Sequence, residues 1–276
     1  MRLVSRAPLA AALAALATLA AGCADPAAGP TSRPSLIVNG TPTGSAYGSV
    51  GALLYDFDGN QKIDGDDQLC TGSLVSATVF LTAAHCVEFL ASGSQLYVSF
   101  SPDLYDHPKS IAATGYAFHP EYNWTYNDAH DIAVVFLPAS ATRGMTPLKL
   151  PPEGYLDALA AKGQLASQLF VNVGYGTSAS ITGEPLFGYD GVRKTSKSEF
   201  MGLKPFFLGL LMQTAATGEG GDCYGDSGGP KFIDGDPTTV VATVVTGDIP
   251  CRSTSWDYRV DTKSARAFLA PYVRLP

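Results

Sequence analysis

Three short segments of the chain carry side chains that together could perform nucleophilic catalysis. His85 lies in Leu-Thr-Ala-Ala-His-Cys (81–86), Asp131 precedes an apolar run, and Ser227 lies in Gly-Asp-Ser-Gly-Gly-Pro (225–230). A serine hydroxyl is too weak an acid to attack a carbonyl carbon unaided, so it needs a neutral imidazole as base. The imidazole in turn needs a carboxylate that fixes its tautomer. These segments predict Ser227 as nucleophile, His85 as base and Asp131 as the residue that orients the base.

The order of these residues along the chain separates two known arrangements. The segment 225–229 also fits the Gly-x-Ser-x-Gly turn of α/β-hydrolases, in which the histidine follows the serine. All four histidines of this chain precede Ser227, so that alternative fails. The order His85, Asp131, Ser227 is the one used in chymotrypsin-like enzymes.

The chain therefore resembles the trypsin/chymotrypsin-type serine proteases, across residues 37–276. Ile-Val-Asn-Gly (37–40), His-Pro-Glu-Tyr-Asn (119–123) and Gly-Tyr-Gly (174–176) are further matches in the family's order. The resemblance implies an all-β fold of two packed six-stranded antiparallel barrels, with a boundary near residue 150 and the catalytic residues between them. It also implies protein or peptide substrates.

The resemblance assigns roles to several other residues. The backbone N–H groups of Gly225 and Ser227 would form the oxyanion hole, which stabilises the negative charge that develops on the substrate oxygen. Two disulfides are expected from the family pattern, Cys70 with Cys86 and Cys223 with Cys251.

In the family, a freed amino terminus pairs with the aspartate that precedes the catalytic serine and orders the site. Here the expected pair is Ile37 with Asp226, and an activating protease would cut after Leu36. Leu36 stands where the family usually has Arg or Lys. We therefore expect either an activator unlike trypsin or cleavage elsewhere.

Three residues are expected in the specificity pocket. Gly221 occupies the position of the acidic residue that selects Arg or Lys in trypsin-like members, and Thr246 replaces a serine of the pocket wall. Asp222 follows Gly221; its carboxylate either reaches the pocket and restores basic selectivity or points to solvent or a backbone amide. The sequence favours a pocket that prefers an apolar or small substrate side chain.

Composition agrees with a turn-rich β fold. The 276 residues include 29 Gly and 19 Pro, and apolar runs bounded by turn residues recur at 50–55, 72–82, 96–100, 132–137, 170–173 and 240–246. Residues 156–168 have helical spacing, although a strand and loop also fits. A short C-terminal helix is expected after Asp261 as N-cap, ending before Pro271. The net charge of −7 without a basic run argues against a nucleic-acid or anionic-membrane partner.

The N-terminus predicts export. Arg2 and Arg6 precede an uncharged stretch, residues 7–22, that is too short to span a bilayer as a helix, and residues 1–23 read as a signal peptide. Leu-Ala-Ala-Gly-Cys (19–23) resembles a bacterial lipobox, which would lipidate Cys23, the odd one of five cysteines, and anchor the protein to a membrane. Ordinary signal cleavage near Cys23 is the alternative. Residues 24–36 read as a linker or propeptide, whose cleavage would release the catalytic part.

One acidic loop resembles a calcium-binding loop, although serine catalysis itself requires no cofactor. Oxygen-bearing side chains stand at positions 1, 3, 5, 9 and 12 of the loop, a spacing suited to a hard cation. Gln61 occupies the position where glycine normally makes the turn, so the alternative is a solvated acidic hairpin loop. The five residues are Asp56, Asp58, Asn60, Asp64 and Asp67.

Two function classes follow from these patterns. The first is an exported serine endopeptidase that acts through an acyl-enzyme, with an esterase of the same mechanism as a variant. The second is a non-catalytic or unactivated homologue that acts as a surface binding protein, which the intact catalytic residues disfavour.

Overall fold

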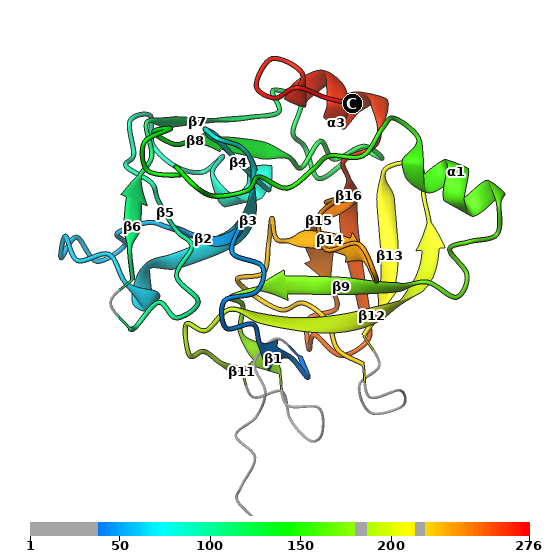
Figure 1. Cartoon of the computed structure of the whole chain (residues 1–276), viewed down its shortest axis with the longest axis horizontal. Helices are drawn as coiled ribbons and strands as arrows, with labels where there is room; N and C mark the ends of the chain where they lie inside the picture. Colours follow the sequence, from blue (N-terminus) through cyan, green and yellow to red (C-terminus); the bar gives the residue numbers. More distant parts are fainter. Residues whose placement is uncertain (1–37, 107, 180–186, 213–218) are drawn as a thin grey trace, which may run out of the picture. The chain divides into compact units, whose positions relative to one another are not determined.

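The computed structural model describes residues 38–106, 108–179, 187–212 and 219–276, and its regular structure is mainly antiparallel strand (Figure 1). The expected lipidation site Cys23, the expected amino terminus Ile37 and the predicted signal peptide and linker lie outside these residues. In the described part, no helix has the length and apolar character needed to cross a membrane.

The first sheet is built from the N-terminal half of the domain. Its strands are paired in the order β6-β5-β2-β3-β4-β8-β7. The sheet curls, and its seven strands replace the six that were expected (Figure 1). Their bounds are β2 Val50–Leu54, β3 Gln68–Ser76, β4 Val79–Thr82, β5 Tyr97–Ser99, β6 Ser110–Ala112, β7 Gly115–Phe118 and β8 Ala133–Phe136.

The second half forms a closed barrel. Strands β12-β13-β16-β15-β14-β9 pair in that order and β9 pairs again with β12, which closes a six-stranded ring. The bounds are β9 Leu169–Gly174, β12 Lys194–Leu203, β13 Phe207–Leu211, β14 Pro230–Ile233, β15 Ala242–Gly247 and β16 Thr254–Arg259. Three two-residue strands add to it or pair beside it: β1 Thr41–Pro42 on β12, and β10 Ser178–Ala179 with β11 Phe187–Gly188.

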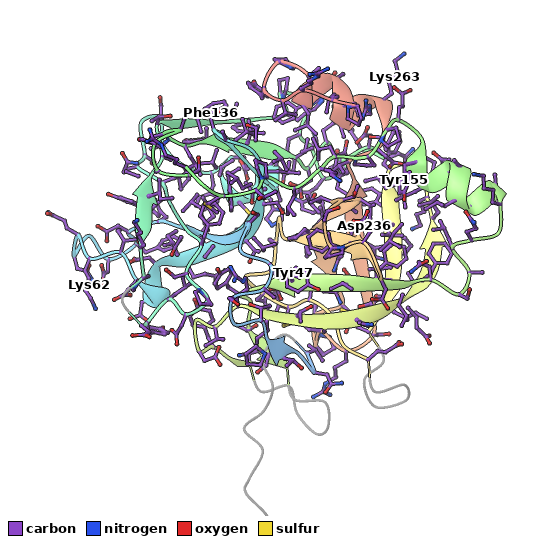
Figure 2. The ribbon with its side chains drawn as sticks, in the orientation of Figure 1. Tyr47, Lys62, Phe136, Tyr155, Asp236 and Lys263 are labelled. Atoms are coloured by element: carbon purple, nitrogen blue, oxygen red, sulfur yellow. A yellow bond between two sulfur atoms is a disulfide. The ribbon has the colours of Figure 1, made fainter. Side chains whose placement is uncertain are left out.

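Apolar residues of both halves pack into one cluster between them. Leu81 and Val134 of the first sheet share it with Val173, Phe232 and Tyr258 of the second. Buried side chains fill the sheets, whereas Lys62 and Lys263 project outward (Figure 2). Burial of β-branched and aromatic residues on both inner faces explains why these short runs form strands. The expected all-β fold of two packed halves is confirmed, although the first half is a curled sheet that does not close and only the second half is a six-stranded barrel.

Four short helices complete the described fold. They are η1 Gly65–Asp67, η2 Ala84–Cys86, α1 Tyr155–Ala161 and the C-terminal α3 Lys263–Leu269. The region 156–168 is thus helical only in its first part. The N-cap of α3 is Thr262, whose hydroxyl accepts the N–H of Ala265 at 3.2 Å. The prediction of Asp261 as the N-cap was wrong by one residue. The carboxylate of Asp261 instead accepts a hydrogen bond from Arg259 Nε at 2.9 Å.

Candidate active site

His85 and Asp131 are brought together by strand pairing. His85 lies in η2, which begins two residues after the end of β4, and Asp131 lies two residues before β8, which pairs with β4. Asp131 is fully buried and accepts two hydrogen bonds from His85, one from Nδ1 at 2.7 Å and one from the backbone N–H at 2.9 Å. An ionised carboxylate can only accept, so the ring hydrogen lies on Nδ1 and Nε2 is left as an acceptor.

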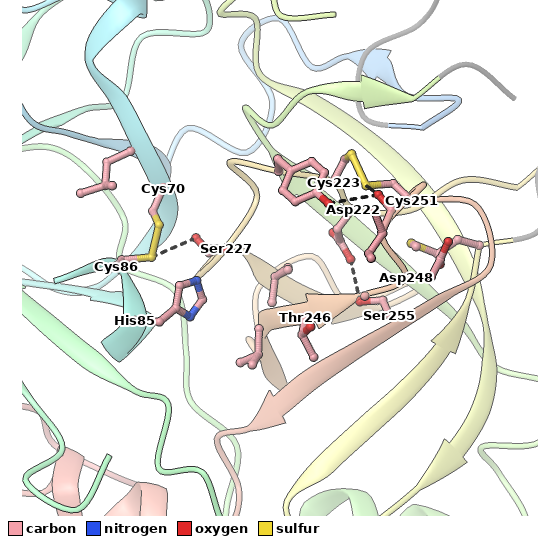
Figure 3. Close-up of a pocket in the computed structure, with 17 residues that line it drawn as sticks. Cys70, His85, Cys86, Asp222, Cys223, Ser227, Thr246, Asp248, Cys251 and Ser255 are labelled. Atoms are coloured by element: carbon pink, nitrogen blue, oxygen red, sulfur yellow. Dashed lines mark hydrogen bonds between the residues drawn. A yellow bond between two sulfur atoms is a disulfide. The ribbon is translucent and has the colours of Figure 1, made fainter. Parts of the chain in front are cut away.

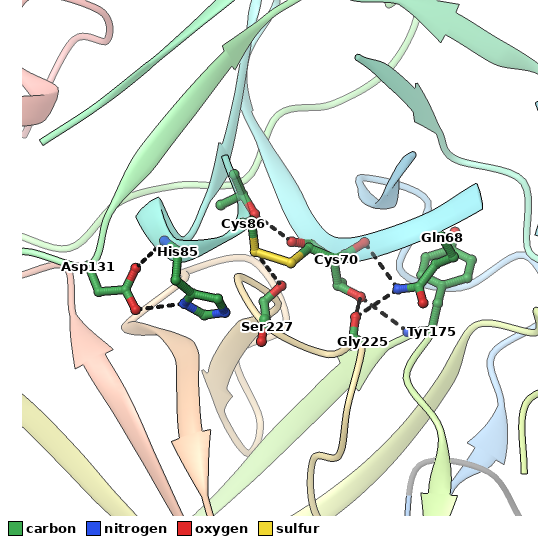
Figure 4. Close-up of a disulfide and its surroundings, with 10 residues drawn as sticks. Gln68, Cys70, His85, Cys86, Asp131, Tyr175, Gly225 and Ser227 are labelled. Carbon is green, nitrogen blue, oxygen red and sulfur yellow. Dashed lines mark hydrogen bonds and ion pairs between the residues drawn. A yellow bond between two sulfur atoms is a disulfide. The ribbon is translucent and has the colours of Figure 1, made fainter. Parts of the chain in front are cut away.

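Ser227 lies on the other side of the imidazole. Figure 4 shows the His85 ring between the Asp131 carboxylate and Ser227. His85 and Ser227 line the same pocket, and the backbone oxygen of Ser227 accepts the N–H of Thr71 at 2.9 Å. A strand of the first sheet thereby holds the loop of the second barrel that carries the serine.

The loop that begins at Gly225 is held by side chains that the sequence did not single out. The backbone oxygen of Gly225 accepts hydrogen bonds from Gln68 Nε2 at 2.8 Å and from Thr71 Oγ1 at 2.9 Å. Gly225 has a φ of 94°, and a Cβ there would lie 2.7 Å from Gln68 Oε1. Glycine is favoured at this position because L-residues with a side chain rarely adopt such a φ, and a side chain here would also displace Gln68.

Both pairs of cysteines expected in the domain are bonded. Cys70 joins Cys86, one residue after His85, with a Cα–Cα distance of 6.3 Å. Cys223 joins Cys251 with a Cα–Cα distance of 5.3 Å.

Comparison with known proteins agrees with this arrangement. The family model named Trypsin matches residues 55–269, most of the chain. This chain belongs to the trypsin family.

Individual proteins of this family and fold share only a small part of their sequence with this chain. Trypsin from Phaedon cochleariae is 29% identical over 184 residues, covering 63% of this chain and 67% of that protein. The structure of HBP is 17% identical with a TM-score of 0.63, covering 87% of this chain and 98% of that one. The structure of HL collagenase is 18% identical with a TM-score of 0.62, covering 87% and 100%. At such identities the two structures show a shared fold alone.

Asp226, which precedes the serine in this trypsin-family chain, is completely buried. Its two carboxylate oxygens accept the N–H groups of Gly176 at 2.8 Å and Cys223 at 2.9 Å. Burial, reinforced by the nearby Asp222 carboxylate, raises the pKa of Asp226 to about 7. Its expected partner Ile37 lies outside the described residues, but the next residue, Val38, is buried and forms a β-bridge with Gly221.

The pocket that His85 and Ser227 line has a volume of about 470 Å³ (Figure 3). Asp222, Thr246 and Met212 are among its lining residues. A Cβ at Gly221 would collide with Met212 Sδ, so the position that is acidic in trypsin-like members has no room for a side chain here. Thr246 is exposed on the pocket wall, after an irregularity in the pairing of β15 with β16.

The acidic loop between β2 and β3 brings together only part of the expected calcium ligands. One carboxylate oxygen from each of Asp56, Asp58 and Asp67 lies within 4.8 Å of the others, and Asp56 Oδ1 is buried without a hydrogen-bond partner. Asp64 instead caps η1 and pairs with Lys62 at 2.5 Å. Asn60 donates its side-chain amide to Asp58 at 2.7 Å. Three carboxylates therefore remain as candidate ligands.

Proposed function

We propose that this protein is a serine endopeptidase that hydrolyses peptide bonds through an acyl-enzyme. Membership of the trypsin family supports protein substrates. The observation that carries the proposal is the double hydrogen bond from His85 to the buried carboxylate of Asp131. It leaves Nε2 as an acceptor on the side of the ring where Ser227 lies, which is what a general base needs.

In the proposed reaction, Ser227 Oγ attacks the substrate carbonyl carbon while His85 Nε2 takes the hydroxyl proton. The resulting oxyanion is stabilised by the N–H groups of Gly225 and Ser227. The C–N bond then breaks, and His85 returns its proton to the leaving amine. Water, deprotonated by His85, hydrolyses the acyl-enzyme and regenerates Ser227. Asp131 stabilises the imidazolium throughout.

The cleavage of a peptide tests the proposal against its two alternatives. The protein purified after export should cleave a mixed peptide library, and Ser227→Ala should abolish the cleavage. Hydrolysis of ester substrates alone would instead support an esterase. A protein that leaves both peptides and esters intact would support the alternative of a surface binding protein.

The proposed site of action is outside the cytoplasm. Disulfides persist in oxidising compartments, and this chain has two, Cys70–Cys86 and Cys223–Cys251. We further propose that Cys23 carries a lipid anchor and that an activating protease cuts near Leu36, so that the new amine of Ile37 pairs with Asp226. Such a cut separates the catalytic domain from its anchor.

N-terminal sequencing of the active, soluble species tests this second proposal. A chain that begins at Ile37 supports release by activation. Active protein that begins at Cys23 or Ala24 would overturn it.

A further inference from the structure

A lysine lies completely buried beneath the pocket. Lys231 of β14 donates from Nζ to Asp222 Oδ2 and to Asn172 Oδ1, the latter at 2.7 Å, and lies 3.6 Å from Asp257 Oδ1. Its side chain has no exposed surface. A buried ammonium is very costly without compensating partners, so this arrangement is specific rather than incidental.

The partner of this lysine faces the pocket. Asp222 lines the cavity, next to the Cys223–Cys251 disulfide in Figure 3. Its Oδ2 atom accepts the hydrogen bond from the buried Lys231 Nζ. Ser255, another lining residue, is hydrogen-bonded to Asp222 at 3.0 Å and to Asp257 at 2.8 Å. One carboxylate that borders the pocket is thus already paired with a cation from within the protein.

The second carboxylate of the cluster adds a negative charge only when it is ionised. Burial, opposed by the nearby Lys231, raises the pKa of Asp257 to about 7. With a proton on Asp257, the cluster of two carboxyl groups and one ammonium is neutral. The charge of Asp222 is then balanced without any cation from a substrate.

The remaining acidic residue on the pocket wall is also engaged. Asp248 accepts backbone N–H groups from Arg252 at 3.0 Å, Ser253 at 2.8 Å and Thr254 at 2.6 Å. Both carboxylate oxygens of Asp248 are thus directed at the backbone of the residues that follow it. Asp248 therefore organises its own loop.

We propose that Lys231 determines the specificity of this pocket, by neutralising Asp222 so that the pocket accepts an uncharged side chain of the substrate. The inference rests on the proposed endopeptidase function. Met212, Val244 and Val245 supply apolar surface to the same cavity. Without the Lys231 charge, the unpaired Asp222 carboxylate would attract a lysine or arginine side chain instead.

The test uses ligand binding, so that it does not depend on catalysis. Benzamidine is a flat cation and benzamide is its neutral near-isostere. Their affinities are measured by calorimetry on the Ser227→Ala protein at mildly acidic pH, below the pKa of Asp257 in the folded protein, so that Asp257 keeps its proton. That protein should bind benzamidine no more tightly than benzamide. Adding Lys231→Met should favour benzamidine by at least about tenfold, because an unscreened buried charge interacts strongly with a ligand cation.

Matched controls separate this effect from a general loss of positive charge or of structure. Lys197→Met removes a half-exposed lysine of the same barrel, paired with Asp234 at 2.7 Å, and should leave the ratio of affinities unchanged. Lys231→Met combined with Asp222→Ser should lose the preference for benzamidine.

Two outcomes would overturn the inference. One is a preference of about tenfold or more for benzamidine with Lys231 intact, a measurement that stands even if the Lys231 variants fail to fold. The other is a folded Lys231→Met protein whose ratio of affinities is unchanged. Profiling of cleaved peptides separates the two proposals. Cleavage mainly after Lys or Arg would contradict the role of Lys231 and leave the endopeptidase proposal intact. Absence of any cleavage would contradict only the endopeptidase proposal.

Discussion

The carboxylate of Asp131 holds His85 at two points, through the ring Nδ1 and through the backbone N–H. The first contact fixes the tautomer and the second fixes the position of the residue from which the ring extends. Both come from a carboxylate with no exposed surface, so water does not compete for it.

Asp131→Asn should nearly abolish catalysis while the protein stays folded. The amide is close in size to the carboxylate, but its N–H₂ group can donate to the ring and stabilise the wrong tautomer. We expect kcat to fall by about ten-thousandfold. Steady-state kinetics with a cleaved peptide, alongside circular dichroism to check folding, measures this. A fall of less than about tenfold in a folded variant would show that Asp131 does not orient the base.

Loss of the side chains that hold Gly225 should weaken the stabilisation of the transition state more than it weakens substrate binding. Gln68→Ala and Thr71→Val each remove one donor to the Gly225 backbone oxygen. We expect kcat to fall by about tenfold with KM little changed, because a looser loop presents the N–H groups of the proposed oxyanion hole less accurately. The affinity for a peptide aldehyde, whose adduct carries an oxyanion, should fall in parallel.

Thr71→Ser provides the matched comparison for this loop, since it retains the hydroxyl and should recover most of the loss. An increase in KM with kcat unchanged would contradict the positioning role and indicate an effect on substrate binding alone.

The sequence was most informative where function depends on a local motif. The segments around His85 and Ser227 identify the candidate catalytic residues, and the pairing of β4 with β8 explains why Asp131 reaches the histidine. Gln68 is different, since it contacts Gly225 across 157 positions of the chain, and no local pattern marks such a contact. The strand count of the first sheet likewise depends on long-range pairing.

The pocket shows the same limit. Gly221 was recognisable as a departure from the trypsin-like pattern, but the reason for it, the sulfur of Met212 in the space where a side chain would start, depends on the tertiary packing. The pairing of Lys231 with Asp222 is also invisible in sequence, because a lysine in a strand ordinarily faces solvent. Charged residues inside a barrel become apparent only once the strands are placed.

Replacing Asp257 should change how stability depends on pH. Burial raises the pKa of this carboxyl from 3.8 to about 7 in the folded protein, so the folded state retains a proton that the unfolded state has lost. The free energy of unfolding should therefore decrease as pH rises between these two values. Asp257→Asn removes one such proton and should flatten the slope. In the uncleaved chain, whose Ile37 amine is not free, Asp226 makes a similar contribution that remains.

Chemical denaturation across that pH window, on the wild-type and Asp257→Asn proteins, measures the difference. An identical slope in the two proteins, or a stability that rises with pH more steeply in the wild type, would contradict the assignment.

Calcium should stabilise the protein if the acidic loop binds it. We expect millimolar calcium to raise the Tm, because a ligand that binds only the folded state stabilises it by mass action. Asp58→Ala should abolish the rise, since Asp58 is one of the three clustered carboxylates. Asp106→Ala, at an exposed acidic residue in another loop, is the control and should retain it. An unchanged Tm in the wild type would exclude a calcium site of useful affinity.

The most direct test of the central claim is covalent labelling by a fluorophosphonate, which reacts with a serine only when a neighbouring base activates it. The folded, processed protein should take up one probe per chain, mapped by mass spectrometry to Ser227, with labelling lost in Ser227→Ala and strongly slowed in His85→Ala. An absence of labelling in the processed protein, or labelling that persists in Ser227→Ala, would contradict the account.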